Sequence, residues 1–311
     1  MSKDSRRWWR KKRFRLSLLL LGQPLVLLLG LVTLNGLVLA DNETPITNQT
    51  AEQLSAAKNS IEKPQLKVLA YNIAKGFCHK GGIKFDDEAA VRQRMLDIAS
   101  VIREQDPDLV FLSEAVFECG PCPVNQVELI AEEAGFDHWI FGENYNLGLP
   151  FYRIVGGNAI LSRTPIEPVD NPSLAGRKPF YVTKNNRRVL WGRLKINGSD
   201  LLLGSIHNDS FDIKNNKRQM QQILDYIGER DALLAGDFNS KPHLPPIELV
   251  KKSEKFSGKF DGAMTFPAHA PDRLIDFIFA PARWQLVNHQ VLDDETSDHR
   301  AVVSVFKVPA E

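Results

Sequence analysis

Two motifs in the C-terminal half of the chain place carboxylate, amide and imidazole side chains at the ends of apolar runs. Asp237 and Asn239 come directly after one such run. Asp298 and His299 come just before another. Side chains held at the ends of buried strands are rigidly positioned. Carboxylates placed in this way can hold a divalent cation and a water molecule against a phosphate. The pattern therefore predicts metal-dependent hydrolysis of a phosphate ester.

Two further carboxylates lie in apolar sequence, where an ionised group needs a partner. Asp276 stands within the apolar residues 274–278, and Glu114 follows the apolar residues 109–112. An unpaired carboxylate in such surroundings costs several kcal/mol, so both are predicted to be paired or functional. Asn72, at the end of a β-prone run, fits a strand cap as well as a metal ligand.

The elements that must position these residues follow from the hydrophobic pattern. Helical periodicity predicts helices over residues 87–105, 125–134 and 212–229. Strands are predicted over residues 66–73, 109–113, 137–142, 157–162, 188–196, 200–206, 232–235, 274–280 and 301–308. Several neighbouring strands are joined by turns rather than by helices. This favours two stacked, mixed sheets with helices outside over a doubly wound parallel sheet.

Six segments around these strand ends occur in an order that resembles the endonuclease/exonuclease/phosphatase superfamily. That group includes DNase I-like nucleases, sphingomyelinases and inositol-phosphate phosphatases. The segments contain Asn72, Glu114, His207, Asp237 with Asn239, Asp276, and Asp298 with His299. The resemblance covers about residues 66–308. It implies an α+β fold, namely a four-layer α/β/β/α sandwich of two mixed β-sheets with outer helices, similar to DNase I.

The resemblance also implies a metal site. Asn72, Glu114 and Asp298 correspond to the family's ligands for Mg²⁺, with Glu114 as the principal one. Carboxylate and amide oxygens suit a hard cation that keeps several of its waters. Mn²⁺ and Ca²⁺ are the alternatives.

Catalytic roles follow from the same resemblance. Asp237 corresponds to the aspartate that orients or deprotonates the attacking water, and Asn239 to its phosphate-holding partner. His299 corresponds to the histidine on the scissile phosphate, and Asp276 to the carboxylate that orients this ring. His207 corresponds to a second histidine, which either protonates the leaving oxygen or stabilises the pentacovalent phosphorus.

Two residues are predicted to contact the substrate. Arg177 belongs to an Arg-x-Pro-Phe sequence that resembles a loop of the secreted nucleases. Asn158 belongs to a segment that resembles the family's central strand. An arginine at such a place also fits a solvated surface charge.

The N-terminal residues differ in composition from the rest of the chain. Residues 1–15 carry eight Lys or Arg residues and one acid, whereas residues 16–40 are almost uninterruptedly apolar. At about 1.5 Å per residue, an apolar helix of this length can cross a bilayer of roughly 30 Å. Residues 41–64 are polar and have the composition of a linker. The catalytic domain is predicted to occupy residues 65–311.

This arrangement predicts a basic cytoplasmic segment followed by a transmembrane anchor or a signal peptide. The catalytic domain would then face the extracytoplasmic side, or be secreted or periplasmic if the chain is cleaved after Ala40. The whole chain holds 39 basic and 38 acidic residues, so removing residues 1–15 leaves 31 basic, 37 acidic and a net charge of −6. An acidic body argues against a strong, sequence-independent grip on nucleic acid.

The cysteines Cys78, Cys119 and Cys122 allow more than one interpretation. Cys119 and Cys122 have the spacing of a thiol redox motif. A structural disulfide, either within this loop or from one of its cysteines to Cys78, is favoured because the expected compartment is oxidising. A zinc site would need a fourth ligand, for which His79 is available.

The predicted partners are a phosphate-ester substrate, either nucleic acid or a phospholipid headgroup, and a membrane bound through residues 16–40. A monomer is expected. The alternative function is a catalytically inactive, surface-displayed binding module of the same fold. The presence of every expected acid and histidine disfavours this alternative.

Overall fold

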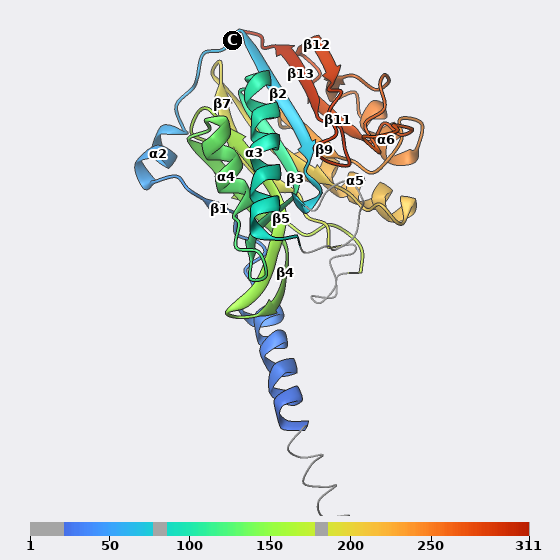
Figure 1. Cartoon of the computed structure of the whole chain (residues 1–311). Coiled ribbons are helices and arrows are strands. Elements are labelled where there is room, and N and C mark those ends of the chain that lie inside the picture. The colour runs from blue at the N-terminus through green and yellow to red at the C-terminus, as the bar shows by residue number, and fades with distance from the viewer. Residues whose placement is uncertain (1–21, 77–85, 178–185, 311) are drawn as a thin grey trace, which may run out of the picture.

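Two β-sheets pack face to face in the domain, and helices cover the outer face of each sheet (Figure 1). A computed structural model describes residues 22–76, 86–177 and 186–310. Three hydrophobic clusters fill the spaces between successive layers. The arrangement confirms the predicted α+β fold of two mixed sheets with outer helices.

The first sheet contains a parallel pair, β2 and β3, among antiparallel neighbours. Its strands lie in the order β1 (Ile46–Thr47), β4 (His138–Leu149), β5 (Tyr152–Ser162), β3 (Leu109–Cys119), β2 (Gln65–Asn72), β13 (Val302–Lys307) and β12 (Gln285–Val291). The helices on its outer face are α3 (Glu88–Gln105) and α4 (Gln126–Ala134).

The second sheet is also mixed, since β8 and β9 are parallel and the other pairs are antiparallel. Its strands lie in the order β10 (Phe256–Gly258), β11 (Asp276–Pro281), β9 (Ala232–Asp237), β8 (Ser199–His207), β7 (Leu190–Ile196) and β6 (Glu167–Asp170). The helices packed against it are α5 (Ile213–Ile227) and α6 (Pro245–Lys252).

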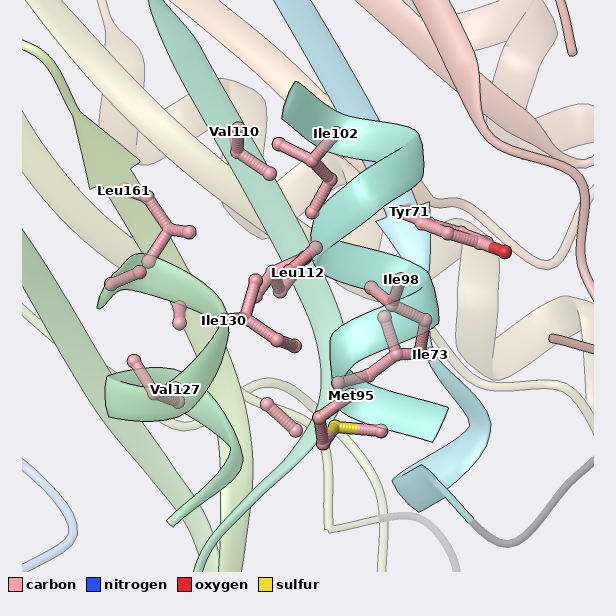
Figure 2. Packing of buried hydrophobic residues seen from close by; sticks show 14 of the residues in the cluster. Tyr71, Ile73, Met95, Ile98, Ile102, Val110, Leu112, Val127, Ile130 and Leu161 are labelled. Carbon is pink, nitrogen blue, oxygen red and sulfur yellow. The ribbon is translucent and has the colours of Figure 1, made fainter. Parts of the chain in front are cut away.

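Helix α3 shows how local sequence builds the first layer. Met95, Ile98 and Ile102 recur at helical spacing and face the sheet that carries Leu112 (Figure 2). The helix begins after Asp87, whose carboxylate accepts a hydrogen bond of 2.8 Å from a backbone amide of the first turn. Replacing one of the buried apolar side chains of this helix by alanine typically lowers the free energy of unfolding by about 2–5 kcal/mol. The packed helix therefore fixes β2 and β3, which carry predicted site residues.

The hydrophobic pattern misses β1, β6, β10, β12 and α6. The four missed strands are the four edges of the two sheets. Edge strands are short or half exposed, so their side chains do not need a regular apolar alternation. Helix α6 begins with two prolines, Pro245 and Pro246, which signal a break in sequence but fit the first turn of a helix.

A helix over Gly22–Leu39 leads into the domain and is long and apolar enough to cross a membrane. Most of its side chains are exposed. In Figure 1 it projects from the domain beside the end of β4. A signal sequence would have the same length and composition. The predicted basic segment 1–15 and the first part of the predicted anchor lie outside the described residues.

The junction between this helix and the domain is polar and buried. Asn35, in the last helical turn, is fully buried, and its Nδ2 donates to Asn146 Oδ1 on β4 at 2.9 Å. Further along, β1 pairs with β4, and Gln49 Nε2 donates to Ile166 O at 2.7 Å. Part of segment 41–64, which has the composition of a linker, therefore lies against the domain.

Glu143, on β4 near this junction, should make the stability of the domain depend on pH. Burial raises the pKa of the Glu143 carboxyl from 4.5 to about 7, although Arg153 and Arg188 act in the opposite direction. Between these two pH values the unfolded chain is ionised at this carboxyl while the folded chain holds the proton. The folded state therefore loses stability as pH rises through this window.

We predict that Glu143→Gln removes this loss and stabilises the domain relative to the wild type by on the order of 1–3 kcal/mol at pH 8. Denaturant unfolding of both proteins at pH 4.5 and pH 8 measures the effect. An equal stability difference at the two pH values would contradict the prediction.

Candidate active site

Strand register in the second sheet brings three predicted catalytic residues together at the ends of neighbouring strands. His207 is the last residue of β8, Asp237 the last of β9 and Asp276 the first of β11. His207 pairs with Asp237, and Asp237 pairs in turn with Asp276. The sequence pattern predicts Asp276 inside a strand, whereas the strand begins at this residue. The carboxylate therefore lies at the end of the strand.

Glu114 reaches the same place from the first sheet because β3 is irregular there. The pairing of β3 with β5 shifts between Leu112 and Ala115. Glu114 has a left-handed backbone with φ of 59°, which is uncommon for a residue with a side chain. An irregularity of this kind redirects a side chain. The Oε1 atom of Glu114 lies 3.4 Å from Nε2 of His207.

The loop before β13 brings His299 against Asp276. Nδ1 of His299 lies 2.9 Å and 3.2 Å from the two carboxylate oxygens of Asp276. The ring also packs on Phe266, with centroids 4.5 Å apart. Ser297 Oγ donates to Asn72 O at 2.7 Å and ties this loop to the end of β2. With Nδ1–H donated to Asp276, the Nε2 atom faces Asn72 Nδ2 at 3.4 Å and Asp237 Oδ2 at 3.8 Å.

His299 is one of the cationic groups of the site. Burial alone would lower the pKa of His299, but the Asp276 and Asp237 carboxylates outweigh burial and raise the pKa to about 9. The imidazole is therefore a cation at neutral pH. The hydrogen bond to Asp276 fixes the orientation of this charged ring.

His207 is neutral. Burial, reinforced by the cations Arg187 and Lys75, holds the pKa of His207 well below its usual value. Arg187 Nη1 lies 3.2 Å from Nδ1 of His207. Because an arginine can only donate, Nδ1 accepts and the ring proton is assigned to Nε2. That Nε2 atom faces the carboxylates of Glu114 at 3.4 Å and Asp237 at 3.6 Å.

Asp237 is buried and held by amide groups. Its Oδ1 accepts a hydrogen bond from Asn239 N at 2.8 Å, and its Oδ2 accepts from Asn239 Nδ2 and Asn72 Nδ2, each at 3.1 Å. Burial and the neighbouring Asp276 carboxylate raise the pKa of Asp237 to about 6. A carboxylate with this pKa is ionised at neutral pH and is a stronger base than an ordinary aspartate.

One cavity of about 320 Å³ collects these side chains. Its wall combines acids, an amide and imidazoles with three cationic side chains, namely Glu114, His207, Asp237, Asn239, Asp298, His299, Arg187, Lys241 and Arg273. Cationic side chains in a concave site attract anions. The cavity is therefore suited to an anionic substrate.

Glu114 and Asp298 both line this cavity, and their carboxylates could hold a cation. Lys75 Nζ forms an ion pair with Glu114, so the position beside this carboxylate already accommodates a positive charge. Burial and the neighbouring Arg187 lower the pKa of Lys75 to about 8. Asn72, the third predicted ligand, directs its Nδ2 to Asp237 and accepts a backbone N–H on Oδ1. Carboxylate oxygens of this kind fit Mg²⁺.

A second group of possible metal ligands consists of Asp237, Asp276 and His299, whose ligand atoms lie within 4.8 Å of one another. This group is less suited to a metal. Both oxygens of Asp276 face Nδ1 of His299, and a protonated imidazole has no lone pair to offer. The Glu114 side of the cavity is therefore the better cation site.

Two predicted substrate-binding residues lie apart from this cavity wall. Asn158 is completely buried, and its Nδ2 donates to Ser205 O at 3.2 Å, so it joins the two sheets. Arg177 is exposed and is the last described residue before 178–185, which hold the remainder of its Arg-x-Pro-Phe sequence.

Sequence reasoning does not single out Lys75, Lys241 or Arg273. The one signal for Lys75 is its place three residues after Asn72, in a turn of three residues with positive φ that ends at Gly76. Nothing in the local sequence indicates that Lys241 and Arg273 face the same cavity, because they come from separate loops of the second sheet.

Cys119 and Cys122 are buried, free thiols near the end of β3. Burial raises the pKa of both thiols. Redox-active cysteines have a lowered pKa, so this environment disfavours the redox interpretation. Cys78 and His79, the candidate partners for a disulfide or a zinc site, lie outside the described residues.

Comparison with known proteins agrees with this geometry. Residues 69–299 match the model of the Endonuclease/Exonuclease/phosphatase family. A similar solved structure is an endonuclease/exonuclease/phosphatase from Beutenbergia cavernae, with 21% identity, a TM-score of 0.62, and 79% of this chain and 72% of that chain covered. No curated protein matches the chain.

Two other similar structures come from Bacteroides thetaiotaomicron and from human. The mannosyl-6-phosphatase of Bacteroides thetaiotaomicron has 18% identity and a TM-score of 0.56, with 78% of this chain and 99% of that chain covered. The catalytic domain of human Nocturnin has 13% identity and a TM-score of 0.57, with 80% and 95% covered. At such identities the likeness concerns the fold.

Replacing Asp276 tests whether its carboxylate keeps His299 charged. In Asp276→Asn we predict that the pKa of His299 falls from about 9 to below roughly 7, because burial then outweighs the remaining charge of Asp237. Proton NMR titration of the imidazoles measures this pKa. A His299 pKa that stays near 9 would contradict the prediction.

Proposed function

The chain belongs to the endonuclease/exonuclease/phosphatase family, and we propose that it is a divalent-metal-dependent phosphohydrolase that attacks a phosphate ester with an activated water. One observation carries the proposal. A buried base, Asp237, a cationic imidazole, His299, and a cation-binding carboxylate, Glu114, line a single cavity. The catalytic domain of human Nocturnin holds a bound sulfate, which supports an anion site in this fold.

In the proposed reaction, Asp237 accepts a proton from the water that attacks phosphorus. Asn239 holds this carboxylate through its backbone and side-chain N–H groups and so keeps the base in position. As the bond between phosphorus and the leaving oxygen breaks, Nε2–H of His299 gives its proton to that oxygen. The proton gained by Asp237 and the proton lost by His299 then return through solvent.

His207 acts by hydrogen bonding, because its ring is neutral and Nε2–H points toward the carboxylates of the site. Of the two roles predicted for it, stabilisation of the pentacovalent phosphorus fits better than protonation of the leaving oxygen. A divalent cation held by Glu114 and Asp298, with Asn72 nearby, would neutralise charge on the phosphoryl oxygens.

We further propose that residues 16–40 stay attached as an anchor and that the catalytic domain, residues 65–311, works as a monomer on the extracytoplasmic side. The buried hydrogen bond from Asn35 to Asn146 supports retention, since cleavage after Ala40 would remove this contact. The basic residues 1–15 favour a cytoplasmic N-terminus.

Asp237→Ala tests the proposed base. We expect the rate of hydrolysis of bis(p-nitrophenyl) phosphate to fall by roughly a thousandfold, because the variant cannot accept the water proton. Circular dichroism and the unfolding midpoint should show that the variant is folded. Asp261→Ala, which removes an exposed carboxylate, is the matched control and should keep full activity. Unchanged hydrolysis in Asp237→Ala would remove the assignment, and an inactive wild type would favour the binding-module alternative.

Removal of divalent cations tests the metal. EDTA should abolish hydrolysis, and Mg²⁺ should restore it, with Mn²⁺ and Ca²⁺ compared in parallel. Glu114→Gln should raise the Mg²⁺ concentration for half-maximal activity by about tenfold or more, because the principal oxygen ligand loses its charge. Glu118→Gln, on the same strand, is the matched control. Full activity in EDTA would refute metal dependence.

A further inference from the structure

Three neighbouring cavities that share lining residues extend from the catalytic cavity to the end of the N-terminal helix, and together they are called the groove. Arg187 lines the catalytic cavity and two neighbouring cavities of about 200 Å³ and 190 Å³. Asn144 and Tyr145 of β4 line both of these neighbours. Gly36 and Leu37 of the helix line the last one. The three cavities therefore form a path from the scissile site to the helix.

The end of the helix is tied to the domain beside this path. Asn35 Nδ2 donates to Asn146 Oδ1 at 2.9 Å. The backbone oxygen of Asn42 accepts from Arg188 Nη1 at 2.9 Å and from Asn171 Nδ2 at 2.6 Å. These contacts fix the orientation of the domain relative to the helix. If the helix spans a bilayer, its last turn lies at the membrane surface, and the groove opens there.

Exposed aromatic side chains lie near this opening and along the groove. Phe151 and Tyr152, at the tip of the hairpin between β4 and β5, are 76% and 52% exposed. Figure 1 shows this hairpin beside the helix. Phe211, which lines the middle cavity, is 61% exposed. Aromatic side chains favour the interface between membrane and water.

The polar groups of the groove fit a phosphate-bearing lipid better than a polynucleotide. Arg187 and Arg188 line its membrane end and favour an anion. The side-chain oxygens of Asn42 and Asn144, two residues that line the groove, are buried and have no hydrogen-bond donor among the described residues. A polynucleotide needs a long cationic track, whereas the helix limits this groove at one end.

We infer that the substrate is a phospholipid of the bilayer that holds the helix. Its phosphate enters the catalytic cavity, its glycerol and ester groups lie along the polar groove, and its acyl chains leave the groove at the membrane end. The inference rests on the proposed function, because the same site performs the hydrolysis. It adds the substrate class and the direction from which the substrate arrives.

The test uses the full chain reconstituted with Mg²⁺ in vesicles of phosphatidylcholine, phosphatidylethanolamine and phosphatidylglycerol in equal parts. Loss of each phospholipid is measured by mass spectrometry of the extracted lipids. Hydrolysis of soluble bis(p-nitrophenyl) phosphate by the same vesicles is measured in parallel. We expect the wild type to cleave at least one of the phospholipids and Asp237→Ala to cleave none.

Asn35→Leu keeps the helix apolar but removes the hydrogen bond that orients the domain. We expect lipid cleavage to fall about tenfold or more, while the soluble ester is cleaved within about twofold of the wild-type rate. Thr33→Leu, an exposed helix position two residues away, is the matched control and should leave both rates unchanged. Phe151→Ser, at a surface position that cannot disturb the core, should lower lipid cleavage several-fold and spare the soluble ester.

The outcomes separate the two proposals. Intact phospholipids together with Asp237-dependent cleavage of the soluble ester would overturn the lipid inference and leave the proposed function standing. Loss of neither substrate would overturn both. Unchanged lipid cleavage in Asn35→Leu, or a higher kcat/KM for plasmid DNA than for the phospholipids in the same vesicles, would also overturn the inference.

Discussion

Hydrogen-bond register among β8, β9 and β11 is the constraint on which the site depends. His207, Asp237 and Asp276 pair directly across these strands. A shift of one residue in either pairing would turn every side chain of the shifted strand to the other face. The apolar residues of the same strands prevent such a shift, because they are buried between the sheets and beneath α5 and α6. The packing of the hydrophobic core therefore also fixes the positions of the catalytic side chains.

Burial of several charges in a small volume gives the site its chemistry. Asp237 and Asp276 repel each other, and the cationic ring of His299 offsets this repulsion. Glu114 is compensated by Lys75. The neutral ring of His207 lies between these two groups of charges and contacts a carboxylate of each. The two histidines therefore take different protonation states: burial and Arg187 keep His207 neutral, whereas Asp276 and Asp237 keep His299 charged.

Sequence alone predicts the parts of this protein that are encoded locally. The two sheets and the acids at their strand ends leave a clear pattern, because a buried strand must be apolar and Asp237 or Asp276 interrupts it. The edge strands leave none, since much of each faces solvent. The direction of the Glu114 side chain depends on the left-handed backbone of Glu114 itself, inside β3. Nothing in the neighbouring sequence signals that conformation. The contact between Asn35 and Asn146 joins residues far apart in sequence, so only the folded chain reveals it.

The claim that one cation lies among the acids and both imidazoles is tested most directly by paramagnetic broadening. Mn²⁺ is added to the protein while the NMR signals of the His207 and His299 ring protons are recorded. The account predicts that stoichiometric Mn²⁺ broadens both sets of signals and that Glu114→Gln abolishes the effect. Sharp His207 and His299 signals in the presence of bound Mn²⁺ would contradict a shared centre.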